Sequence, residues 1–106
     1  MPISMPVLIL AAATAYSVAM IGMKLWVGQG VSVLIVSIVV AAIVIGAVAE
    51  LGVLREERLG MTYVLILGAE CLIIGVASVW YFGESFTLRE GVGAALIVAG
   101  TALAWA

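Results

Sequence analysis

The stretch that decides the fold is residues 31–54, VSVLIVSIVVAAIVIGAVAELGVL, in which Glu50 is the only charged side chain. It is long enough to cross a bilayer, because a membrane-spanning helix needs about 20 apolar residues for a hydrocarbon core roughly 30 Å thick. Its many valines and isoleucines favour strands in water. In hydrocarbon, however, only a helix can satisfy its own backbone hydrogen bonds, so this stretch is predicted to be a transmembrane helix.

The composition extends this interpretation to the whole chain. Of the 106 residues, 67% are hydrophobic and 9% are charged, and the mean hydropathy is +1.42. Three further apolar runs cover residues 7–27, 60–82 and 88–105, with short polar turns between the runs. The sequence therefore predicts an all-α membrane protein in which four short transmembrane helices form a single domain, residues 1–106, surrounded by the lipid bilayer.

Composition also excludes several classes of function. The formal charge is −2, and four basic residues are too few for a nucleic-acid-binding surface. Histidine is absent and the single cysteine, Cys71, lies inside an apolar run. Because no nucleophile–base pair, metal-ligand cluster or phosphate loop is present, we expect neither an enzyme nor a cofactor. No basic residue precedes the first run, so we expect it to remain a permanent span rather than a cleaved signal peptide.

The basic residues define no preferred orientation in the membrane. If the spans alternate, Lys24 and Arg89 lie on one side, and Arg55 and Arg58 lie on the other. The rule that basic loops remain cytoplasmic therefore gives a tie. Two interpretations stay open: the charges are too few to be informative, or the chain inserts both ways and pairs as an antiparallel dimer.

Small residues in the fourth run predict helix–helix contacts. Helices in lipid associate by close packing, which small side chains at regular spacing permit. Gly93 and Gly100 lie on one such stripe, and we expect them, together with Ile97, to contact a second copy or a paired homologous subunit. The alternative is that the small residues pack only within one bundle.

Glu70 is the position most indicative of function, because it lies near the middle of the third run. A carboxylate at that depth costs about 3 kcal/mol on insertion scales, so we expect it to face the protein interior. Desolvation favours its protonated form unless a cation lies beside it, as a group that exchanges a proton for a cation requires. The alternative is a protonated carboxyl that donates one interhelical hydrogen bond.

Three other polar side chains are considered with it. Tyr16 is the one large polar group at mid-depth in the first run, and Tyr63 opens the third run, where it suits either a pathway or an interface anchor. Glu50 lies about a turn from Arg55 and is interpreted as an acid in contact with headgroup water. We therefore predict Glu70, Tyr16 and Tyr63 as substrate- or proton-binding residues, and no metal site.

Three motifs carry a resemblance to a known family: GMTY at 60–63, WYFGE at 80–84 and GAALIVAG at 93–100. In their order and spacing they resemble the third-span tyrosine, the following turn and the fourth-span motif of the small multidrug resistance family, within the drug/metabolite transporter superfamily. Members of that family are bacterial inner-membrane proteins that export cationic compounds by proton exchange. The resemblance implies an antiparallel homodimer or a heterodimeric pair, with fourth-helix contacts and a small-molecule substrate.

The chain departs from that family at the proton site. The family's first-span glutamate corresponds to Tyr16, and the first run contains no acid. Ile66 stands in place of a tryptophan; Gly68 matches, but Glu70 replaces a second glycine. We predict a small transporter of a cationic or amphipathic substrate, with Glu70 as the hypothesised proton-exchanging acid. The alternatives are a flippase-like subunit for lipid-linked sugars and a non-transporting partner subunit of a larger membrane complex.

Overall fold

The computed structural model describes residues 4–105, which form four helices: α1 (Ser4–Gln29), α2 (Val33–Leu54), α3 (Leu59–Trp80) and α4 (Leu88–Trp105). All four helices are long and apolar enough to cross a membrane. The prediction of an all-α chain with four apolar helices is therefore confirmed. The chain is an integral membrane protein with four candidate spans.

Local side chains set where two of the helices begin. At the start of α2, the hydroxyl of Ser32 accepts a hydrogen bond from the backbone N–H of Ile35 at 3.1 Å. Before α4, the N–H of Thr87 donates to Glu90 Oε1 at 2.9 Å, and the N–H of Glu90 donates to Thr87 Oγ1 at 3.1 Å. This reciprocal pair is a capping box, which satisfies two N–H groups that the first turn of a helix leaves free. It explains why α4 begins at Leu88.

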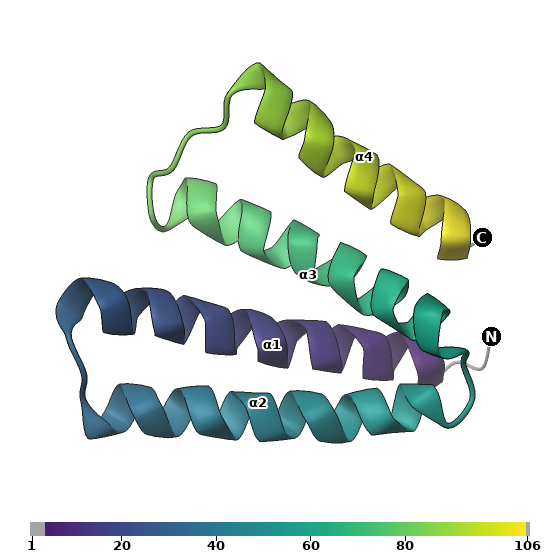
Figure 1. The fold of residues 1–106 in the computed structure, drawn as a ribbon, viewed down its shortest axis with the longest axis horizontal. Coiled ribbons are helices and arrows are strands. Elements are labelled where there is room, and N and C mark those ends of the chain that lie inside the picture. The colour runs from purple at the N-terminus through teal and green to yellow at the C-terminus, as the bar shows by residue number, and fades with distance from the viewer. Residues whose placement is uncertain (1–3, 106) are drawn as a thin grey trace.

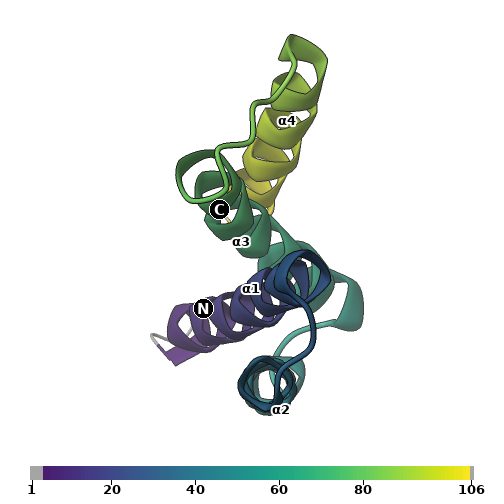
Figure 2. The ribbon, with the colours of Figure 1, turned by 90° about the vertical axis from the view of Figure 1, so that its left-hand side faces the viewer.

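The helices lie in the order α2, α1, α3, α4 across the molecule, each antiparallel to the next along the chain (Figures 1 and 2). The central helix α1 packs against both α2 and α3, whereas α4 contacts α3 alone. The main buried cluster joins α1, α2 and α3 and consists of Met5, Ile9, Ala12, Ala13, Ala49, Val53, Leu65 and Ile66. No residue of α4 between Leu88 and Trp105 is fully buried. The core therefore belongs to the first three helices.

Two glycines allow close approach between helices. The ring of Tyr16 on α1 lies over Gly46 on α2, where a Cβ atom would come within 2.8 Å of the tyrosine ring. On α3, a Cβ atom at Gly68 would overlap the side chain of Thr101 on α4. Small residues at such points let helix backbones approach in lipid. Gly68 and Thr101 therefore mark a point of close contact between α3 and α4.

We expect Gly68→Ala to destabilise the bundle, because the new methyl group must push Thr101 and α4 away. Overpacking of this kind costs about 1–3 kcal/mol. The matched control is Gly75→Ala on the same helix, since a Cβ atom there meets nothing within 4 Å. Both changes add the same helix propensity, so the difference in unfolding free energy in mixed micelles reports the clash. Equal free energies for the two variants would contradict this packing.

Candidate functional site

The polar centre of the membrane-embedded region is a hydrogen bond between α1 and α2. The hydroxyl of Tyr16 donates to Glu50 Oε1 at 2.9 Å. Glu50 is one turn further along α2 than Gly46, so both lie on the face that α1 covers. The missing side chain at Gly46 makes room for the tyrosine ring, and the ring directs its hydroxyl to the carboxyl group. The register of the α1–α2 hairpin therefore creates this pair.

Glu70 on α3 is the third member of this cluster. It lies near the middle of its helix and is half-buried, and its neighbour Ala69 packs against the same core cluster as Tyr16. Three helices thus bring two carboxyl groups and a phenol into one neighbourhood. We call Tyr16, Glu50 and Glu70 the acidic cluster.

In the part of the chain that the structure describes, no basic side chain forms an ion pair with the acidic cluster. Within residues 4–105 the only salt bridge joins Arg58 and Glu57, at 3.9 Å in the turn after α2. Carboxylates at membrane depth are costly unless they are paired, protonated or in contact with water. The two acids of the cluster are therefore protonated, in contact with water or matched by a cation from outside the chain.

Glu70 also borders a groove between α3 and α4. The groove has a volume of about 420 Å³. Its lining includes the polar residues Glu70, Cys71, Ser78 and Glu84, and the rest is apolar or glycine. Since Glu70 touches both the groove and the acidic cluster, the groove connects the cluster to the surface of the bundle.

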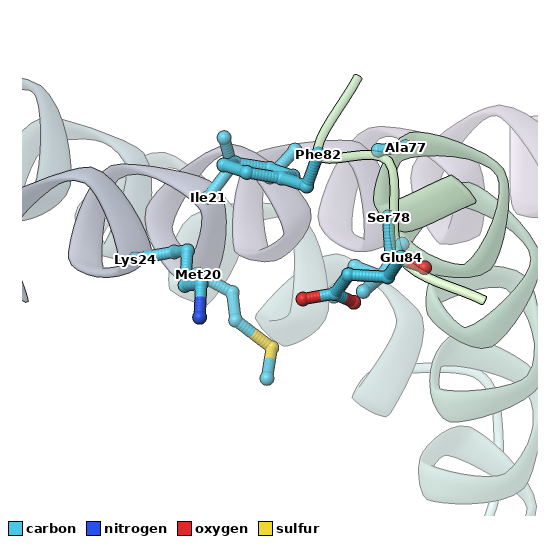
Figure 3. A pocket seen from close by; sticks show the side chains of 8 residues that line it. Met20, Ile21, Lys24, Ala77, Ser78, Phe82 and Glu84 are labelled. Atoms are coloured by element: carbon cyan, nitrogen blue, oxygen red, sulfur yellow. The ribbon is translucent and has the colours of Figure 1, made fainter. Parts of the chain in front are cut away.

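At one end, the groove meets a smaller pocket of about 130 Å³ (Figure 3). Both hollows share Met20, Ile74, Ser78 and Glu84 in their lining. The smaller pocket adds Lys24 from α1, and it lies at the end of the bundle where α1 and α3 finish (Figure 1). The two hollows therefore adjoin each other between Glu70 and that end of the bundle.

The predicted site residues separate into two groups. Tyr16 and Glu70 lie together in the acidic cluster, whereas Tyr63 is 63% exposed near the start of α3 and does not line the groove at Glu70. The structure adds Glu50, which the sequence indicated only as an interfacial acid. Its partner Tyr16 is 34 positions away, so no local pattern links the two residues. No group of three or more possible metal ligands occurs within residues 4–105.

The residues predicted as dimer contacts lie on exposed parts of α4, and one of them, Ile97, also lines the groove toward α3. Ile97 is 47% exposed, and both Gly93 and Gly100 are exposed. A Cβ atom at either glycine would meet nothing within 4 Å. These positions are therefore accessible to another chain.

Comparison of the chain with protein-family models, with curated proteins and with solved structures gives no match. The class of the molecule is therefore defined by its own fold and site. It is a small integral membrane protein of four helices, with a cluster of two acids and a tyrosine between the first three.

Proposed function

We propose that the protein exchanges small organic cations for protons across the membrane, at Glu70 and the acidic cluster. The observation that carries the proposal is the pair of carboxyl groups, Glu50 and Glu70, that no basic residue of the described chain neutralises. A carboxylate in such surroundings binds either a proton or a cation. Competition between these two occupants is the basis of exchange.

The three residues of the acidic cluster have different roles in the proposed exchange. Glu70 borders the groove, so it is the acid that an incoming cation meets first. Tyr16 donates a hydrogen bond to one carboxylate oxygen of Glu50, which fixes the orientation of that carboxyl group. A bound cation neutralises the ionised carboxylates of the cluster, and protonation of these carboxylates releases the cation. Transporter sites near the bilayer midplane commonly work in this way, with access from alternate sides.

The groove favours an amphipathic substrate. It offers an apolar wall to the body of the molecule and the carboxyl group of Glu70 to its charge. The resemblance to the small multidrug resistance family supports the same class of cargo, although the acids here are on α2 and α3 rather than α1.

A second copy of the chain is part of this proposal, because α4 leaves most of its surface open. We expect Gly100→Leu to weaken association about tenfold or more, since a large side chain keeps two helices apart. The same change fits the open space around Gly100 within one chain. The matched control is Gly60→Leu, at an equally open position on α3. Energy transfer between labelled copies in liposomes measures association, and equal association of both variants would contradict an α4 interface.

The function is tested with the purified protein in liposomes that carry a pH gradient. Tetraphenylphosphonium and a panel of other monovalent organic cations are added outside, and their uptake is measured with the interior acidic. The proposal predicts uptake against the concentration gradient that collapses when the pH gradient is removed. Uptake that is equal with and without the gradient, or no uptake for any member of the panel, would refute proton-coupled exchange of this class.

A further inference from the structure

The small pocket at the end of the groove is lined by two opposite charges that do not pair with each other. Lys24 comes from α1 and Glu84 from the α3–α4 connection, and Figure 3 shows both at the edge of the hollow. No salt bridge joins them. The volume of about 130 Å³ far exceeds the roughly 15 Å³ that one water molecule needs by this measure. The pocket is therefore large enough for a small group that carries both signs of charge.

The depth of the pocket matches the headgroup layer. Lys24 lies in the second half of α1 together with Met20 and Ile21, and the rest of the lining comes from the last turns of α3 and the connection after it. Trp26 and Trp80 belong to the same two helix ends, and tryptophan favours the membrane–water interface. Both charges are therefore held where phospholipid headgroups lie.

The pocket adjoins an apolar groove, with which it shares four lining residues. The groove between α3 and α4 reaches about 420 Å³ and is walled by apolar side chains such as Leu67, Phe86 and Ile97. A ligand that fills both hollows needs a zwitterionic head and an apolar chain. Phospholipids with an ammonium headgroup meet both requirements.

We propose that Lys24 and Glu84 bind the zwitterionic headgroup of a membrane phospholipid of the phosphatidylethanolamine type. Lys24 faces the phosphate and Glu84 faces the ammonium, while an acyl chain lies in the groove between α3 and α4. This binding does not depend on the proposed transport activity. If both hold, a cationic substrate reaches Glu70 by displacing the acyl chain.

The test is native mass spectrometry of the purified full chain, titrated with palmitoyl-oleoyl phosphatidylethanolamine or with the phosphatidylglycerol of the same chains. The wild type should retain the ethanolamine lipid in preference to the glycerol lipid. Lys24→Gln and Glu84→Gln should each weaken binding of the ethanolamine lipid about fivefold, the effect of losing one accessible charge pair. The double exchange Lys24→Glu with Glu84→Lys should restore binding, because it keeps both charges in the pocket.

Two controls make the result decisive. Arg89→Gln removes a cation at the same end of the bundle that lines neither hollow, and it should leave binding unchanged. Circular dichroism measures the helix content of each variant and so identifies any variant that fails to fold. If a single variant fails to fold, the double exchange Lys24→Glu with Glu84→Lys is used to test the two charges instead. No preference between the two lipids, or an equal loss in Arg89→Gln, would overturn the proposal. Displacement of the lipid by equimolar free phosphoethanolamine would overturn the lipid as ligand and assign the pocket to soluble zwitterions.

Discussion

Glu70→Gln is expected to lower proton-coupled uptake of organic cations about 100-fold or more, the scale on which removal of a proton-transferring side chain acts. Glutamine has nearly the size of glutamate and, like the protonated acid, both donates and accepts hydrogen bonds, but it can neither bind nor release a proton. The site would then hold no exchangeable proton at the position that borders the groove. The measurement is uptake into liposomes under an imposed pH gradient.

The control for this variant is Glu56→Gln, which removes an exposed acid in the turn after α2 and should retain the wild-type rate. Circular dichroism and elution volume show whether both variants fold and assemble alike. Retained pH-driven uptake in a folded Glu70→Gln protein would contradict the assignment of Glu70. It would leave Glu70 as a protonated carboxyl that only holds helices together.

The second large effect is expected from the Tyr16–Glu50 pair. Glu50→Gln removes one of the two acids, and Tyr16→Phe removes the hydrogen bond of 2.9 Å to it. Since hydrogen bonds to charged groups contribute about 1.5–3 kcal/mol, each change should alter the apparent cation affinity about tenfold or more. Direct binding of tetraphenylphosphonium at several pH values measures both variants.

The double variant, Tyr16→Phe with Glu50→Gln, shows whether the two residues act together. If the tyrosine acts through Glu50, the double variant should bind the cation about as well as Glu50→Gln alone. Residues that share one hydrogen bond give such non-additive effects, whereas distant independent sites add. Strict additivity of the two single effects would contradict a functional pair.

The fold was readable from the sequence because each helix follows an apolar run long enough to span the hydrocarbon. The start of α4 was also encoded locally: Thr87 and Glu90 have the spacing of a capping box, and the structure forms it. The position of Glu70 at mid-depth indicated a cost, and hence a role, without knowledge of its neighbours. These features depend on local sequence alone.

The features of the site that the sequence did not predict depend on how one helix packs against another. Glu50 becomes part of the cluster because α1 places Tyr16 over Gly46, and that register is set by packing across the whole hairpin. Tyr63 lies two turns before Glu70 on α3, about 10 Å along the helix axis, so it stays apart from the cluster. Likewise, the small residues of α4 predicted helix–helix contacts but did not indicate that, within the bundle, α4 contacts only α3.

The most direct test of proton-coupled exchange is proton release on cation binding by the purified wild-type protein in weakly buffered solution. Addition of tetraphenylphosphonium should acidify the medium, because the cation displaces protons from the acidic cluster, and the signal should be lost in Glu70→Gln. Binding of the cation without any proton release, at every pH where binding is detected, would contradict the exchange of protons for cations at this site.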